Sequence, residues 1–251
     1  MSLQGKVALI TGGAKNLGAL IALSFAEQGA NLSLHYNSPS TASAAKTLQA
    51  TLSSKYPNIK VAFFVADLTS EVAVNKLFSD TVAEFEKVDI VINTVGMVLK
   101  KPLIQFTEAE YDNMSAVNTK SAFLIFKASG LNVADGGKII TIVTSLVGAF
   151  TGFYTAYAGT KGAVEHFSRG LAKELVSKRI SVNCIAPGPM DTPFFYPQET
   201  DDSIAYLKSG AMEGRLTTIE DIAPIVKFLV TEGQWINGQT IFANGGALAA
   251  R

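Results

Sequence analysis

Several ingredients of common binding and catalytic sites are scarce in this sequence. It has one cysteine, Cys184, and two histidines, which excludes an internal disulfide framework and argues against a zinc site of the usual ligands. Charged residues make up only 17%, and 21 basic residues balance 21 acidic ones, whereas a nucleic-acid partner requires a basic face. No apolar run reaches the length of a membrane span, and residues 7–10 are too few for a signal-peptide core. We therefore expect a cytoplasmic protein with no metal, no nucleic-acid partner and no membrane partner.

What the chain has is apolar residues, 48% of the total, in two alternating patterns. Short β-branched runs predict strands at 7–11, 31–36, 60–66, 88–93, 138–144, 180–186 and 239–243. Helical spacing lies between them, at 17–28, 40–54, 71–86, 107–129, 156–177 and 219–230. This alternation predicts an α/β fold: one Rossmann domain over residues 1–251, with a doubly wound, mostly parallel seven-stranded sheet flanked by helices.

The longest irregular stretch, about 187–215, is rich in proline and aromatic residues. It begins directly after a strand's carboxyl end, where ligands bind in open α/β sheets, so we expect a substrate lid. The alternative is that its aromatic side chains fill the core or a subunit contact.

A glycine-rich turn connects the first strand to the first helix. Residues 11–18 read T-G-G-A-K-N-L-G, and glycines here let backbone N–H groups approach a pyrophosphate at a helix N-terminus. The turn resembles the T-G-x-x-x-G-x-G motif of short-chain dehydrogenases/reductases, with Asn16 in place of the middle glycine. Asparagine tolerates a left-handed backbone better than other non-glycine residues, so the turn is expected to persist.

The end of the second strand indicates which dinucleotide binds. An acidic residue at this place usually binds the adenosine 2′-hydroxyl, but the chain reads His35-Tyr36-Asn37-Ser38. Lys15 in the glycine turn is close to where a 2′-phosphate would lie. Together these features favour NADP(H) over NAD(H).

A Y-x-x-x-K pair, Tyr157 and Lys161, opens a helical stretch, and a spacing of four places both on one helix face. Ser145 lies twelve residues upstream and Asn118 on the preceding helix. This order, with P-G-x-x-x-T at 187–192, resembles the short-chain family over residues 4–246. The resemblance implies that Tyr157 is the general acid, that Lys161 lowers the tyrosine pKa and holds the nicotinamide ribose, that Ser145 stabilises the substrate oxygen, and that Asn118 positions a proton-relaying water.

The resemblance also implies two sets of contacts. The cofactor would be bound by Gly12, Lys15, Asn16, Leu17, Gly18, His35, Tyr36, Asn37, Ser38, Asp67, Leu68, Asn93, Gly96, Tyr157, Lys161, Pro187, Gly188, Met190 and Thr192. For Asn93 we favour a structural role between neighbouring strands. The substrate would be lined by Met97, Leu146, Val147, Phe153, Tyr154, Phe194 and Phe195, an apolar wall that suits a hydrophobic ketone.

The sequence thus predicts an NADPH-dependent oxidoreductase that reduces a ketone to a secondary alcohol. A 3-oxoacyl-acyl-carrier-protein reductase is one alternative, and a non-catalytic NADP(H)-binding sensor is another. The resemblance further implies a homotetramer, with Phe123, Phe126, Phe167 and the tail Ala247–Ala250 as candidate contact surface.

Overall fold

In the computed structural model, which describes residues 2–247, seven strands form one sheet in the order β3-β2-β1-β4-β5-β6-β7. All neighbouring strands are parallel. The strands are β1 Val7–Thr11, β2 Asn31–Tyr36, β3 Val61–Val65, β4 Val88–Asn93, β5 Val133–Ile142, β6 Ser181–Pro187 and β7 Thr240–Ala243. The predicted doubly wound Rossmann-type sheet is confirmed.

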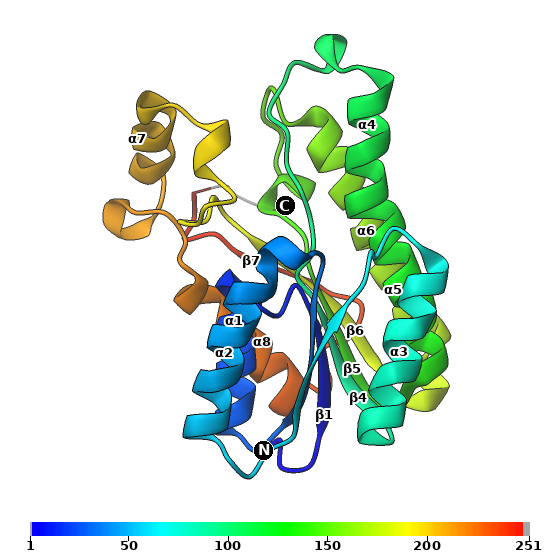
Figure 1. Ribbon diagram of the computed structural model, residues 1–251. Coiled ribbons are helices and arrows are strands. Elements are labelled where there is room, and N and C mark those ends of the chain that lie inside the picture. The colour runs from blue at the N-terminus through cyan, green and yellow to red at the C-terminus, as the bar shows by residue number, and fades with distance from the viewer. Residues whose placement is uncertain (1, 248–251) are drawn as a thin grey trace.

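Helices cover both faces of the sheet (Figure 1). One layer holds α1 (Asn16–Glu27), α2 (Ala42–Lys55) and α8 (Ile219–Thr231); the other holds α3 (Glu71–Phe85), α5 (Ser121–Asn132) and α6 (Thr155–Glu174). Successive strand side chains point to opposite faces, so Ile10 packs in the first layer's core and Leu9 in the second's. Within residues 2–247, no helix combines the length and apolar composition needed to cross a membrane.

Several predicted boundaries differ from the structure; β5, for example, begins at Val133 and not at 138. The helix expected at 107–129 is divided into α4 (Glu108–Ser115), a π-helical turn (Ala116–Lys120) and α5. A further helix, α7 (Asp201–Ser209), lies in the stretch expected to be irregular. Thr200 begins it with a capping box closed by Ser203, a short polar signal without the apolar period on which helix prediction depends.

The chain leaves the sheet after β6 and returns to nearly the same place. The Asp191 N–H donates to the Thr217 carbonyl at 2.8 Å, and the Thr217 N–H donates to the Pro189 carbonyl at 3.0 Å. Residues 191–216, which include α7, therefore project from the carboxyl end of the sheet on a closed base (Figure 1). We call this stretch the 191–216 segment. Short 3₁₀ turns complete the structure at Pro39–Thr41, Leu103–Gln105, Ser145–Val147, Val176–Lys178, Tyr196–Gln198 and Met212–Gly214.

Candidate active site

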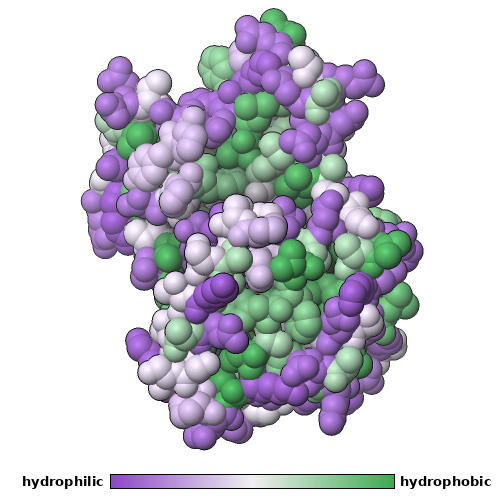
Figure 2. Space-filling model, viewed as in Figure 1, coloured by the Kyte–Doolittle hydropathy of each residue, from purple (hydrophilic) through white to green (hydrophobic). Residues whose placement is uncertain are grey.

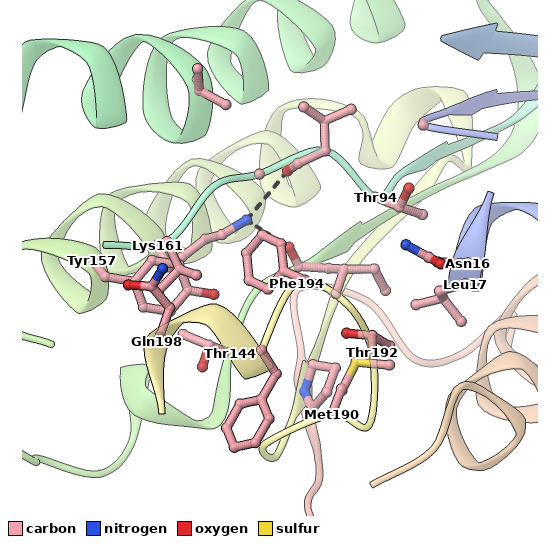
Figure 3. A pocket seen from close by; sticks show the side chains of 18 of the residues that line it. Asn16, Leu17, Thr94, Thr144, Tyr157, Lys161, Met190, Thr192, Phe194 and Gln198 are labelled. Carbon is pink, nitrogen blue, oxygen red and sulfur yellow. Dashed lines mark hydrogen bonds between the residues drawn. The ribbon is translucent and has the colours of Figure 1, made fainter. Parts of the chain in front are cut away.

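A cavity of about 930 Å³ opens at the carboxyl ends of the strands. It lies where the strand order reverses, between β1 and β4, which is the usual ligand position in such sheets. Figure 2 shows hydrophobic side chains gathered in the hollow between α7 and α4. In Figure 3, Tyr157, Lys161, Thr144 and Gln198 lie on one side of the cavity, and Asn16, Leu17 and Thr94 lie on the other.

The glycine turn has the backbone that its sequence requires. Gly12 has φ +68° and Asn16 has φ +48°, so the asparagine adopts the left-handed conformation expected of it. A Cβ on Gly18 would lie 2.3 Å from the Gly12 carbonyl oxygen, so only glycine allows this close approach of turn and helix. Helix α1 begins at Asn16 with no side-chain cap on its first N–H groups, which leaves a site suited to an anion.

His35 connects this turn to the end of β3. Its ring is 1% exposed, and its Nδ1 accepts the Gly12 N–H at 3.2 Å while Nε2 lies 2.9 Å from the Ala66 carbonyl. Nδ1 as acceptor and Nε2–H as donor describe a neutral ring. Burial lowers the pKa of His35, although the bond to Ala66 acts in the opposite direction. The imidazole thus positions the turn from behind and offers no polar atom to the cavity.

The adenosine end of the cavity carries hydroxyl and amide groups. Asn37, Ser38 and Ser40 line it together with Lys15, and the Ser38 and Ser40 hydroxyls lie 2.7 Å apart. The carboxylate of Asp67 is turned to its own loop, where the Thr69 N–H and hydroxyl donate to it and lower its pKa. This end therefore accommodates a 2′-phosphate without a facing carboxylate.

Tyr157 and Lys161 lie one turn apart on α6 and are both buried, at 7% and 4% exposure. The Lys161 ammonium donates to the carbonyls of Ile142 at 3.2 Å and Val95 at 3.4 Å (Figure 3). Burial lowers the pKa of Lys161 to about 8. Burial also raises the pKa of Tyr157 to about 12, against an opposing hydrogen bond from Thr144. The phenol therefore holds its proton at neutral pH, and the predicted lowering of its pKa by Lys161 is not found.

Thr144 and Ser145 are adjacent, but their hydroxyls serve different partners. The Ser145 hydroxyl donates to the Ala186 carbonyl at 2.9 Å and accepts from the Asn244 amide at 3.1 Å. Thr144 instead lines the cavity, and its hydroxyl acts to lower the pKa of Tyr157. The structure therefore turns the hydroxyl of the predicted residue, Ser145, into the protein and brings Thr144 to the phenol, because consecutive side chains of an extended backbone point in opposite directions.

Asn118 lies in the π-helical turn and is 1% exposed. Its Oδ1 accepts the Met97 N–H at 2.7 Å, and its Nδ2 donates to the Met97 carbonyl and the Thr160 hydroxyl. Its Oδ1 lies 3.2 Å, and Lys161 Nζ 2.8 Å, from where a Cβ on Gly96 would be. Asn118 and Lys161 thus converge behind Gly96, and any larger residue there would displace the ammonium.

This geometry agrees with comparisons to known proteins. A family model described as "Enoyl-(Acyl carrier protein) reductase" matches residues 12–247. A short-chain type dehydrogenase/reductase of Picea abies is 37% identical, over 97% of this chain and 93% of that protein. The chain belongs to the short-chain dehydrogenase/reductase family. An Arabidopsis thaliana protein named chloroplastic NADPH-dependent aldehyde reductase 2 is 35% identical, over 99% and 96% of the two chains. A crystal structure of a putative dehydrogenase from Burkholderia cenocepacia with bound NADP is 51% identical, with a TM-score of 0.95 and coverage of 99% and 95%.

Most residues that the family resemblance predicted do border the cavity, and four do not. Asn93 accepts the Thr11 hydroxyl at 2.7 Å and so connects β4 to β1, which is the structural role favoured for it. Asn118 is hydrogen-bonded to Met97 and Thr160. Met97 packs beside Met114 and Tyr157, and Val147 packs against the core formed with α5 and α6. Met97 and Val147, which were predicted to line the substrate, therefore pack into the protein and do not border the cavity.

Several residues of this short-chain dehydrogenase/reductase cavity were not predicted from the sequence. They include Thr94, Val95, Lys100, Thr144, Phe150, Gln198 and Glu199. Strand alternation was a usable signal for Thr144. No local sequence pattern indicated that Lys100 and Glu199 line the cavity, because they pair across 99 positions of the chain.

Proposed function

We propose that this protein is an NADPH-dependent reductase that converts a hydrophobic ketone or aldehyde into the alcohol. One observation carries the proposal: Tyr157 and Thr144 line the same cavity, beside a buried Lys161. That is an acid and a second donor for one carbonyl oxygen, at the end of a cavity that begins at a glycine turn.

The cavity fits the proposed dinucleotide. The close approach at Gly18 and the uncapped start of α1 suit a pyrophosphate. Lys15, Asn37 and Ser38 would hold a 2′-phosphate, and Lys161 would hold the nicotinamide ribose. Pro187, Gly188, Met190 and Thr192 border the opposite wall. The NADPH named for the Arabidopsis relative and the NADP held by the Burkholderia structure support the same choice.

The chain's own residues supply the proton and the charge stabilisation. NADPH supplies the hydride that reaches the carbonyl carbon. Tyr157 donates its proton to the carbonyl oxygen, and Thr144 donates a hydrogen bond to the same oxygen as negative charge develops there. Lys161, with a pKa near 8, favours the resulting phenolate and returns a proton to it. Asn118, locked beside Gly96, orders the route by which that proton is replaced from solvent.

The walls favour an apolar substrate. Leu146, Phe150, Phe153, Phe194 and Phe195 line the substrate end, and such walls bind hydrophobic ligands with few polar contacts. The 191–216 segment supplies two of these side chains, in keeping with the predicted lid. A free sugar or another strongly hydrated carbonyl compound would lose water here without replacement hydrogen bonds.

Assembly as a homotetramer is part of the proposal. Phe123 and Phe167 are 47% and 38% exposed, with ring centroids 6.0 Å apart, so they form an apolar face on α5 and α6. Phe126 is buried in the core and is not available as predicted. The tail Ala247–Ala250 extends beyond the described residues. Light scattering after size exclusion tests the tetramer, whereas a cytoplasmic location remains a prediction.

The test of the function is NADPH oxidation with a panel of ketones and aldehydes. We expect wild-type turnover with apolar carbonyl compounds, and turnover lower by about 10²–10⁴-fold in Tyr157→Phe, the usual size of a general-acid contribution. NADPH binding, followed by fluorescence, should persist in the variant. Tight NADPH binding without turnover over the whole panel would instead favour the non-catalytic sensor.

A further inference from the structure

The side chain of Glu199 is unusually buried for an acidic residue in a segment that projects from the sheet. It lies in the 191–216 segment, just before α7, yet its side chain is only 1% exposed. A carboxylate removed from water is costly unless it is paired and hydrogen-bonded. The groups that pair with the Glu199 carboxylate therefore show where the 191–216 segment is attached to the rest of the protein.

Those partners come from separate parts of the chain. Lys100, in the loop after β4, places its ammonium 2.5 Å from Glu199 Oε2. Tyr154, at the start of α6, donates its hydroxyl to Oε1. Ser203 of α7 donates to Oε2 at 2.5 Å. The neighbouring Gln198 strengthens the contact, because its side-chain oxygen accepts the Lys100 N–H at 2.7 Å.

The electrostatics agree with a fixed, charged carboxylate. Burial would raise the pKa of Glu199, but hydrogen bonds from Lys100, Ser203 and Tyr154 outweigh it and lower the pKa. Burial and the same carboxylate raise the pKa of Tyr154 well above its usual value. Tyr154 therefore keeps its proton in the bond to Glu199 and does not compete with Tyr157 as an acid.

The contact reaches the reacting group through Tyr154. The Tyr154 ring packs edge-on against the Tyr157 ring, with centroids 6.2 Å apart and planes at 62°. Lys100 Nζ lies 5.5 Å from the centre of the Tyr154 ring. Lys100, Tyr154, Gln198, Glu199 and Ser203 all border the cavity. The Glu199 carboxylate thus connects the 191–216 segment to Lys100 and to Tyr154, whose ring packs against Tyr157.

We propose that Glu199 is a positioning residue: it fastens the 191–216 segment over the substrate end of the cavity and fixes Tyr154 as the wall against which the carbonyl compound is held. The inference rests on the proposed reductase function. Opening the segment exposes the carboxylate and separates it from Lys100 and Tyr154. Closing it restores all of these bonds together, so the closed position is sharply defined.

The experiment compares Glu199→Gln with Glu213→Gln. Glu213 belongs to the same segment, but its side chain is 66% exposed and pairs with Arg215 outside the cavity. Two properties are measured with NADPH present: the rate of trypsin cleavage after the exposed Lys208, and kcat and KM for the carbonyl substrate. NADPH affinity and thermal unfolding confirm that each variant is folded.

We expect Glu199→Gln to raise both the cleavage rate and the KM by about tenfold or more, the factor expected for losing a hydrogen bond to a charged group. NADPH affinity and kcat should change much less, and Glu213→Gln should behave as wild type. Tyr154→Phe, which removes one bond and keeps the ring, should move both quantities in the same direction by a smaller factor.

Cleavage of Glu199→Gln at the wild-type rate overturns the inference, whether or not a substrate is known. Faster cleavage with an unchanged KM also overturns it, because the pocket wall would then not depend on Glu199. The cleavage comparison does not use turnover, so failure of the proposed function and failure of this inference are distinguishable.

Discussion

The roles of Thr144 and Ser145 can be separated by two conservative substitutions. Thr144→Val keeps the shape of the side chain and removes the hydroxyl that lines the cavity near Tyr157. If that hydroxyl stabilises the substrate oxygen, kcat should fall by about 10²–10³-fold, which corresponds to about 2.7–4 kcal/mol. Stability should change little, because among the described residues the Thr144 hydroxyl accepts one long hydrogen bond, from the Leu146 N–H at 3.3 Å.

Ser145→Ala should lower the stability of the protein and change its turnover little. The serine is 1% exposed, and its hydroxyl bonds the Ala186 carbonyl and the Asn244 amide. Its removal deprives two buried groups of these bonds, which costs about 1–3 kcal/mol of unfolding free energy. A chain of this size loses about 2–4 °C in Tm for each kcal/mol. Turnover of the folded enzyme should stay within a few-fold of wild type.

The assay is the initial rate of NADPH oxidation at saturating cofactor and substrate, with thermal unfolding of each variant recorded alongside. Thr144→Ser is the control, because it restores the hydroxyl and should recover most of the turnover. A hundredfold loss of kcat in Ser145→Ala, with Thr144→Val fully active, would refute the assignment and return the role to Ser145.

Three further predictions concern the cofactor turn and the lysine. The pKa of His35 is lowered in the folded chain, so below about pH 6.5 the unfolded chain binds more protons than the folded one. The unfolding free energy should therefore fall as the pH is lowered, by at most about 1.4 kcal/mol per pH unit. His35→Gln should remove this part of the slope in urea titrations, with exposed His166→Gln as control. Gly96→Ala places a Cβ 2.8 Å from the Lys161 ammonium and should lower kcat by about a hundredfold. Gly170→Ala, where a Cβ meets nothing within 4 Å, should leave kcat unchanged, and equal kcat values for the two variants would contradict the packing argument. Lys15→Ala should raise the KM for NADPH about tenfold and leave that for NADH unchanged; equal increases would show that Lys15 does not bind the 2′-phosphate.

Much of the architecture follows from the sequence because it depends on local patterns. Strand β1 was predicted to the residue, since a β-branched run bounded by a glycine turn has few alternatives. The left-handed Asn16 was predicted from its place in a glycine motif and from the tolerance of asparagine for that backbone. The pairing of Tyr157 with Lys161 on one face follows from helical spacing. Strand–helix alternation then fixes a parallel sheet, and with it the edge at which these groups meet.

The tertiary structure decided what depends on direction and on distant partners. Thr144 and Ser145 are both hydroxyl residues at the same strand end, and only the orientation of the strand determines which one faces the cavity. The π-helical turn at Asn118 interrupts a helix whose apolar spacing continues on both sides. Glu199 reads in sequence as one more acidic residue of a surface stretch. Its burial arises because folding brings it to Lys100, 99 positions away, and to Tyr154, 45 positions away. Local propensity fixes which groups the chain contains, whereas only packing fixes which of them share the cavity.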